Sequence, residues 1–425
     1  MTEKKKIAVV GAGISGLTCA YELQNAGFDV TVMESRGQVG GRMSSRVKDD
    51  FIFDLGADHL CNLYVEMKKY CKEFGIEWEP MRFLKYGVFR DGEVLSMKDV
   101  IGKLSKVRLT LQYLSTRDVG NFFNLNELAQ HDKDNAYDFM KRRTGLEVSD
   151  YFVDAFTSTY QFHRSDEISL GALFGIMQSI NRDQKGWDLH RTKGGMQALP
   201  DAFADRLNVR LDNPVKEVEG GEQVTVDGEK FDAVVLASQA NRTKKFYKNP
   251  TQEQKKILDS AKYAESISVA FRVDRSKLPD TAIVWVPYVQ SEKISGYVNE
   301  AMKGEQMIHD GKSLVCVWLH EEYAKMLSKV DDDKVFDAVK KEFVRVCPWF
   351  QSVDEIESFD LERWPEAMPK FYNGYLKTAK EFIEGEGQGA QNVFFTGDYL
   401  NSPWTEGALR CGQRVAKQVT EKLLS

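Results

Sequence analysis

Residues 7–34 of the chain, IAVVGAGISGLTCAYELQNAGFDVTVME, decide its fold. The apolar run at 7–10 ends directly in a glycine-rich turn, and residues 17–26 continue with helical periodicity up to Gly27. Residues 28–33 follow as a second apolar run that contains β-branched side chains. The stretch therefore predicts a strand, a tight turn, a helix and a second strand, which form one βαβ unit of a parallel sheet.

The glycines of the turn have the spacing GxGxxG, which is typical of a phosphate-binding loop. The first permits the tight turn, the second lets the backbone approach a pyrophosphate, and the third allows close packing of helix on strand. Glu34 closes the second apolar run, where its carboxylate can accept hydrogen bonds from ribose hydroxyls. The candidate dinucleotide-binding residues of this unit are Gly11, Gly13, Ile14, Ser15, Gly16, Glu34 and Ser35.

A second glycine pair follows shortly after Glu34, in Gly40-Gly41-Arg42. Its backbone and the arginine can cradle and neutralise the same diphosphate from the other side. NAD-dependent Rossmann folds do not ordinarily carry this second element. Gly41 and Arg42 are therefore added to the candidate cofactor-binding residues.

These motifs resemble the flavin-containing amine oxidase superfamily, which includes protoporphyrinogen oxidases and carotenoid desaturases. The resemblance rests on IAVVGAGISG at 7–16, VTVMESRGQVGGR at 30–42 and FDLGA at 53–57. It continues, in family order, with KGGMQALPDAFADRL at 193–207. The cofactor that the resemblance implies is FAD.

The resemblance also covers the C-terminal part of the chain. VFFTGD at 393–398 and WTEGALRCG at 404–412 look like the strand, aspartate and helix start that hold the ribityl chain and isoalloxazine. An aspartate at a strand end can bind hydroxyl groups, and the partial positive charge of a helix start stabilises an anionic reduced flavin. No cysteine occurs in 362–376 or directly before the helix start, so we expect noncovalent binding. The residues implicated here, with the valine whose backbone is expected to meet the adenine, are Val215, Gly397, Asp398, Thr405 and Ala408.

The expected fold class is α/β, with a discontinuous FAD-binding domain of Rossmann type, similar to that of glutathione reductase. We assign residues 1–97, 190–264 and 385–425 to this domain. A helical subdomain is expected at 98–189 and an inserted mixed-sheet substrate domain at 265–384. Charged helices are expected at 252–264 and 332–346 and a strand at 224–226, and the segment at 214–218 resembles a strand of the family. Because only one Rossmann unit is supported by the sequence, a reductase with a separate NAD(P)H domain is not expected.

The expected substrate site lies in front of the flavin. In amine oxidases two aromatic side chains guide the substrate there, and Trp404 and Tyr372 are our candidates, with Tyr375 as an alternative to the latter. Ser266 stands where the resemblance leads us to look for a lysine, which argues against a typical amine oxidase. The segments at 165–170 and 362–372 look more like those of protoporphyrinogen oxidases and desaturases, whose substrates are large and apolar.

The sequence thus supports three hypotheses. The first is an FAD-dependent oxidase or dehydrogenase that takes hydride from a bulky, apolar, porphyrinogen- or polyene-like substrate, with oxygen, a quinone or another compound as acceptor. The second is an amine oxidase that uses oxygen, and the third is a flavin-dependent isomerase without net redox chemistry. In each, the flavin supplies the hydride chemistry and the protein supplies position and electrostatics.

Composition excludes several other classes of protein. The 425 residues are 42 % hydrophobic and 29 % charged with a net charge of −6, so a nucleic-acid-binding surface is not expected. The six cysteines are scattered without metal-ligand spacing, and we expect no metal site. No apolar run is long enough to span a bilayer, so a cytoplasmic location is the default, with contact at a membrane surface left open.

Overall fold

The computed structural model describes residues 4–81, 86–116, 122–182 and 188–424. Its nucleotide-binding part is built on a five-stranded sheet in the order β10-β2-β1-β14-β20. All four pairings are parallel. In that order the strands are Asn208–Arg210, Asp29–Met33, Lys6–Val10, Ala233–Leu236 and Val393–Phe395.

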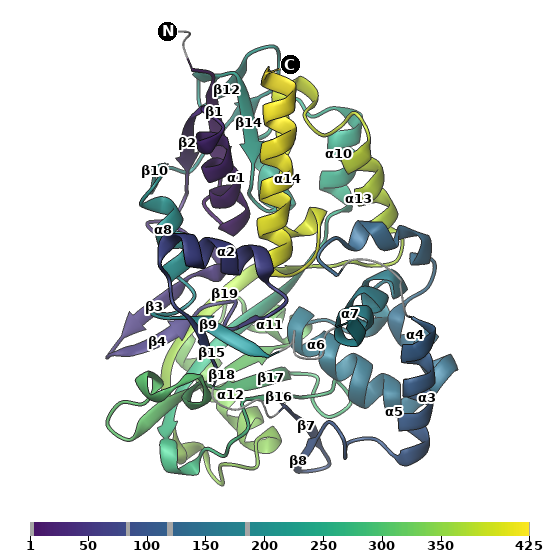
Figure 1. The fold of residues 1–425 in the computed structure, drawn as a ribbon. Coiled ribbons are helices and arrows are strands. Elements are labelled where there is room, and N and C mark those ends of the chain that lie inside the picture. Colours follow the sequence, from purple (N-terminus) through teal and green to yellow (C-terminus); the bar gives the residue numbers. More distant parts are fainter. Residues whose placement is uncertain (1–3, 82–85, 117–121, 183–187, 425) are drawn as a thin grey trace.

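The helices of the two sequence motifs pack against each other beside this sheet. α1 (Ile14–Asn25) and α14 (Thr405–Leu424) run side by side in Figure 1. A Cβ atom on Gly412 would lie 2.3 Å from the carbonyl oxygen of Ser15, so the approach of the two helices requires glycine there. The C-terminal motif is thereby packed against the N-terminal phosphate loop.

The second large sheet has seven strands in the order β19-β15-β18-β17-β16-β7-β8. Two of its strands are long, with 12 residues in β15 and 14 in β19, and they reach from this sheet towards the nucleotide-binding part (Figure 1). In sheet order the strands are Ile356–Pro369, Tyr263–Asp274, Lys312–Leu319, Ile294–Asn299, Ile283–Trp285, Tyr86–Arg90 and Glu93–Ser96.

The edge strands β7 and β8 come from the N-terminal part of the chain, inside the segment assigned by sequence to the FAD-binding domain. β7 pairs in parallel with β16, so both strands belong to the seven-stranded sheet. We propose that residues 86–96 be counted with the substrate region. The three smaller sheets join β11 (Val218–Glu219), β12 (Val224–Val226) and β13 (Glu229–Phe231); β3 (Ser45–Lys48) and β4 (Phe51–Asp54); and β5 (Leu60–Cys61), β9 (Leu189–Thr192) and β6 (Trp78–Pro80).

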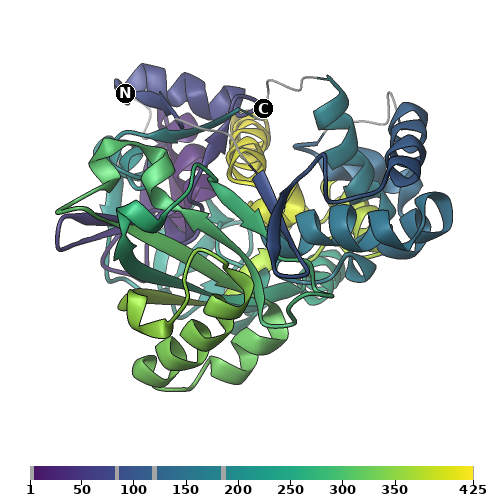
Figure 2. The ribbon, with the colours of Figure 1, turned by 90° about the horizontal axis from the view of Figure 1, so that it is seen from below.

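A group of helices from the middle of the chain lies at one side of the seven-stranded sheet, as the view from below in Figure 2 shows. These helices are α3 (Lys103–Ser115), α4 (Ala136–Thr144), α5 (Leu146–Val148), α6 (Ala155–Gln161) and α7 (Leu170–Arg182). The remaining α-helices are α2 (Val65–Phe74), α8 (Ala198–Ala204), α9 (Ala240–Phe246), α10 (Gln252–Ser260), α11 (Glu321–Leu327), α12 (Asp332–Val346) and α13 (Tyr375–Glu384). The parallel sheet, the mixed sheet and the group of helices confirm the expected α/β fold class.

Two elements differ from the sequence-based expectation. The helix expected at 252–264 ends at Ser260, because Tyr263 already pairs with Pro369 as the first residue of β15. The strand expected at 214–218 starts only at Val218, so Val215 lies in the loop before it. No helix within the described residues combines the length and apolarity needed to cross a bilayer.

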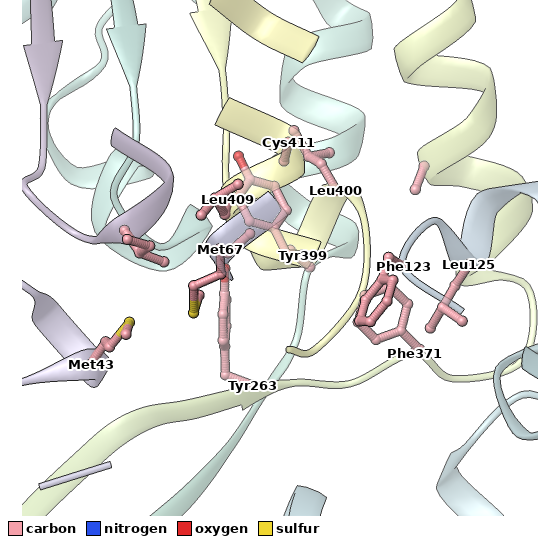
Figure 3. Close-up of a cluster of buried hydrophobic side chains, with 14 of the residues drawn as sticks. Met43, Met67, Phe123, Leu125, Tyr263, Phe371, Tyr399, Leu400, Leu409 and Cys411 are labelled. Atoms are coloured by element: carbon pink, nitrogen blue, oxygen red, sulfur yellow. The ribbon is translucent and has the colours of Figure 1, made fainter. Parts of the chain in front are cut away.

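The core between the cofactor motifs is apolar and closely packed. Figure 3 shows Met67 of α2, Leu409 of α14, Tyr263 of β15 and Tyr399 drawn together where these elements meet. All four side chains are buried. The four residues belong to one continuous hydrophobic core.

Candidate cofactor and substrate site

The first glycine turn leaves room for a ligand at one position only. Gly11 has φ of +109° and lies against the backbone of Ala237, while a Cβ on Gly16 would be 2.1 Å from the carbonyl oxygen of Gly11. At Gly13, by contrast, no atom lies within 4 Å of where a Cβ would be. This open side of the backbone, at the N-terminus of α1, is where a pyrophosphate can approach.

The second glycine pair faces the first turn. The amide of Gly40 donates to the carbonyl oxygen of Ala12 at 2.8 Å, and Gly13 and Gly40 form an isolated parallel bridge. A Cβ on Gly41 would lie 3.6 Å from the Cα of Gly13. The two turns, which α1 and β2 separate in the sequence, therefore lie together as the sequence predicts.

Glu34 is buried beside the first turn. One carboxylate oxygen accepts from the amide of Ala12 at 2.8 Å, and the other accepts from the amide of Arg36 at 2.9 Å and the hydroxyl of Ser35 at 3.1 Å. These bonds fix the carboxylate at the carboxyl end of β2. An adenosine ribose bound over the turn would meet it there.

Arg42 and Asp398 meet although they come from opposite ends of the chain. The two guanidinium nitrogens of Arg42 lie 2.7 and 3.1 Å from the two carboxylate oxygens of Asp398, which is a bidentate ion pair. Asp398 follows Gly397, whose φ of +155° brings the chain sharply out of β20. Arg42, a candidate to contact the diphosphate, and Asp398, a candidate to contact the ribityl chain, are therefore direct neighbours.

The start of α14 holds Trp404, Thr405 and Ala408. The amide of Ala408 donates to the carbonyl oxygen of Trp404 at 2.9 Å, which closes the first turn of the helix. Glu406, within the same turn, is completely buried and accepts from the amides of Glu66 and Met67 at the start of α2, both at 2.9 Å. Sequence analysis did not identify this role of Glu406, which joins α14 to α2.

Two of the predicted residues lie outside this arrangement of charged groups and glycine turns. Val215 is half-buried in the loop before β11. Tyr372 donates from its hydroxyl to the carbonyl oxygen of Ser260, and the ammonium of Lys262 lies over its ring at 4.4 Å. Two other rings meet Trp404 instead: that of Phe122, at 5.2 Å between centroids, and that of Tyr160 on α6, at 6.0 Å.

Tyr160, which the sequence motifs do not single out, lies among several aromatic rings. Its centroid is 6.0 Å from that of Trp404, 6.0 Å from that of Trp285 and 6.4 Å from that of Trp318. Phe156, one helical turn earlier, lies 5.0 Å from it. We call Phe156, Tyr160, Trp285, Trp318 and Trp404 the aromatic wall. Three separate chain segments besides α6 supply its rings, so sequence spacing gives no direct sign of it.

A buried group of charges lies next to the aromatic wall. The imidazole of His59 is 5.8 Å from the ring of Tyr160, and its Nδ1 is 2.5 Å from a carboxylate oxygen of Asp58. The ammonium of Lys303 lies 2.8 Å from Glu300, 3.4 Å from Asp54 and 3.8 Å from Asp58, and its side chain is fully buried. Asp58 and His59 directly follow the FDLGA motif, and this position is the sequence feature that could have identified them as candidate site residues.

Burial and neighbouring charges shift these carboxyl groups in opposite directions. Burial raises the pKa of Glu300 to about 7, even though Lys303 acts to lower it. For Asp58 the effect of burial is outweighed by His59 and Lys303, which hold its pKa below the usual value. The ionised carboxylate of Asp58 can therefore accept a hydrogen bond from the Nδ1–H of His59, which leaves Nε2 as the ring nitrogen without a proton.

The residues present fit a flavin dinucleotide. The space beside Gly13 and the facing glycine turn are suited to a diphosphate at the carboxyl ends of β1 and β2, and Arg42, paired with Asp398, lies next to the second turn. A surface hollow of about 410 Å³ is lined by Lys6 and Asp29 at the opposite strand ends and takes no part in this site.

Such a turn on a parallel sheet, with a second glycine turn against it, defines the protein as a dinucleotide-binding protein. Residues 14–420 match the family of flavin containing amine oxidoreductases, and the chain belongs to that family. It is therefore an FAD-dependent oxidoreductase, which confirms the cofactor and the class of enzyme expected from the sequence.

Individual relatives agree with this membership. Protoporphyrinogen oxidase 2 of Arabidopsis thaliana is 25 % identical over 257 residues, which is 50 % of each chain. The matched part thus spans half the length of that relative. A putrescine oxidase mutant superposes with a TM-score of 0.80 at 18 % identity over 99 % of both chains. Cyclohexylamine oxidase from Brevibacterium oxydans superposes with a TM-score of 0.78 at 16 % identity over all of both chains. At these identities the two structures show a shared fold.

Proposed function

We propose that the protein is an FAD-dependent oxidase or dehydrogenase that takes hydride from a bulky, largely apolar substrate of porphyrinogen or polyene type. The observation that carries the proposal is the aromatic wall, which Trp404 and its contact with Tyr160 join to the start of α14. Aromatic faces contribute large apolar contact areas and bind extended conjugated systems by stacking. Oxygen, a quinone or another acceptor would then take the electrons.

We propose that the cofactor-binding roles fall on the residues identified by sequence. The glycine turns, Ile14 and Ser15 would hold the diphosphate with Arg42, while Glu34 and Asp398 would bind hydroxyl groups of the cofactor. Thr405 and Ala408 would lie against the flavin ring, and FAD would supply the hydride acceptor. Trp404, and Tyr160 more than Tyr372, would position the substrate.

The pair of Asp58 and His59 would add a proton acceptor to this site. The carboxylate holds the imidazole in one orientation, with Nε2 directed away from the pair. A substrate that loses a proton as well as a hydride could transfer the proton to Nε2 of His59. Lys303 would act behind the pair as a positioning residue.

An amine substrate is the second candidate, and one observation favours it. The rings of Trp404 and Tyr160 lie 6.0 Å apart at 62°, so two neighbouring aromatic rings could contact a neutral amine. Against it, Ser266 is buried and donates from its hydroxyl to the carbonyl oxygen of Leu319, where the resemblance led us to look for a lysine. Isomerisation without net redox chemistry is the third candidate.

Anaerobic mixing of the FAD-loaded protein with one substrate of each class tests the proposal. We expect a polyene or porphyrinogen to bleach the flavin absorbance rapidly and completely. Bleaching by an amine, with peroxide release when air is admitted, would establish the second candidate and refute the first. A rearranged product with the flavin still oxidised at the end would establish the third.

A further inference from the structure

The helix α3 turns an apolar stripe away from the protein. Leu104, Val107, Leu111 and Leu114 are 63, 57, 61 and 48 % exposed. Their spacing of three or four residues places all four side chains on one face of the helix. Monomeric soluble proteins rarely leave an ordered row of aliphatic side chains uncovered, so this face is a candidate for binding.

The opposite face of α3 fixes the helix in this orientation. Leu109 and Gln112 are buried, and the side-chain oxygen of Gln112 accepts from Arg143 of α4 at 3.3 Å. At the start of the helix, the carboxylate of Glu147 accepts from the amide of Gly102 at 3.0 Å and from the hydroxyl of Ser105 at 2.5 Å. Polar contacts therefore face inwards, and the apolar stripe faces outwards.

Basic side chains border the stripe. By helical spacing Lys103 and Lys106 lie on one side of it and Arg108 on the other, and the 13 residues of α3 include no acidic residue. Lys141 and Arg143, on the neighbouring helix α4, are also exposed. A local excess of positive charge on a chain with a net charge of −6 indicates an anionic partner surface.

We propose that α3 docks the protein on the surface of a bilayer that contains anionic lipid. Aliphatic side chains on one face with lysine and arginine at its borders are the pattern of a helix that lies in the membrane interface. The long basic side chains can extend to the headgroups while the stripe enters the acyl boundary. Leu146, 52 % exposed and next to Gly145, which adjoins Arg108, would extend the apolar contact.

A protein partner fits this face less well. Protein interfaces are enriched in aromatic residues and depleted in lysine, and energetically dominant positions rarely carry leucine or valine. The exposed stripe of α3 carries aliphatic side chains between basic ones. In Figure 1, α3 also lies at the outer margin of the molecule, where a flat surface can reach it. The inference does not depend on which substrate the enzyme oxidises.

Co-sedimentation of the FAD-loaded chain with vesicles tests the inference. Vesicles of phosphatidylcholine alone are compared with vesicles that also contain phosphatidylglycerol. We expect binding to the anionic vesicles that weakens as salt is added. The double variant Leu104→Ser, Leu111→Ser should bind at least tenfold more weakly, because the inserted apolar area is lost. Lys103→Gln with Arg108→Gln should weaken binding to the anionic vesicles by about fivefold per charge, the equivalent of roughly 1 kcal/mol each.

The matched control removes exposed apolar side chains elsewhere. Val47 and Met326, 69 and 73 % exposed on β3 and α11, are both replaced by serine, and this variant should bind like the wild type. Equal flavin content in all variants shows that they are folded. Wild-type protein left in the supernatant with both vesicle types would overturn the proposal, as would unchanged binding of the α3 variant. A dimer that the leucine substitutions dissociate, without vesicle binding, would overturn it too and identify a second copy of the chain as the occupant.

Discussion

Gly13 and Gly16 stand three residues apart in one turn, but a side chain would meet different surroundings at the two positions. At Gly16 it would collide with the carbonyl oxygen of Gly11, whereas at Gly13 it would enter open space. The spacing of the motif predicts the close packing at Gly16, and the structure shows it. The role of Gly13 towards a ligand stays a prediction, because the requirement for glycine there is not set by the protein's own atoms.

Substitution at these two positions should separate folding from cofactor binding. Gly13→Val should keep the melting temperature of the apoprotein near that of the wild type but abolish FAD binding, since the branched side chain would fill the phosphate position. Gly16→Val should lower the stability of the apoprotein itself. Calorimetric melting and fluorescence titration with FAD measure the two effects. Stoichiometric FAD in Gly13→Val would show that the phosphate loop lies elsewhere.

Trp404 contacts Tyr160 and Phe122 and is part of the aromatic wall. Trp404→Ala should retain FAD, because the diphosphate and hydroxyl contacts lie elsewhere. Substrate should, however, reduce the bound flavin at least tenfold more slowly than in the wild type. Trp349, which packs on Tyr297 of the seven-stranded sheet, provides the control. Trp349→Ala should lower the melting temperature without slowing reduction. If the two variants behave alike, Trp404 serves packing only.

At the scale of elements, strands and helices with strong local patterns were predictable. The helix at 332–346 and the strand at 224–226 have the expected bounds because apolar periodicity and turn residues define them locally. The sequence predicts a helix through 261–264, but these residues lie partly in β15, since pairing with β19 overrides local propensity. The contact of α6 with the start of α14 depends on packing between distant segments, which no local pattern shows.

The joint between α14 and α2 makes an element-scale prediction. Glu406→Ala would remove the acceptor of the Glu66 and Met67 amides and leave Arg410 without its carboxylate partner. We expect a loss of about 2 kcal/mol in the free energy of unfolding. Denaturant titration measures it, with Glu421→Ala on an exposed position of the same helix as control. Equal stability of the two variants would show that α2 does not depend on this contact.

At the scale of the whole molecule, Lys303 and its carboxylates connect two parts of the chain. Asp54 lies in the FDLGA motif and Asp58 directly after it, while Glu300 and Lys303 follow β17 of the seven-stranded sheet. The FDLGA motif can be recognised in the sequence, but its partner Lys303 cannot, because the lysine lies in a distant segment that carries no motif of its own. Charge pairing at such separation is set by topology.

This connection should make stability depend on pH. The pKa of Glu300 is raised to about 7 by burial, from 4.5, so between these values the folded state binds the extra proton. The contribution of Glu300 to stability is therefore present below about pH 4.5 and is lost as the pH rises through 7. The melting temperature of Glu300→Gln, relative to wild type, should rise over this range. The exposed substitution Glu386→Gln should show no such trend, and a flat difference for Glu300→Gln would contradict the assignment.

The central claim is that segments from both ends of the chain form one noncovalent FAD site. Its most direct measurement is the ratio of flavin to protein after acid precipitation of the purified enzyme. We predict one equivalent of FAD in the supernatant and none in the pellet, because the described contacts are hydrogen bonds, charges and packing. Flavin retained in the precipitate, or a colourless protein that does not take up added FAD, would contradict the account.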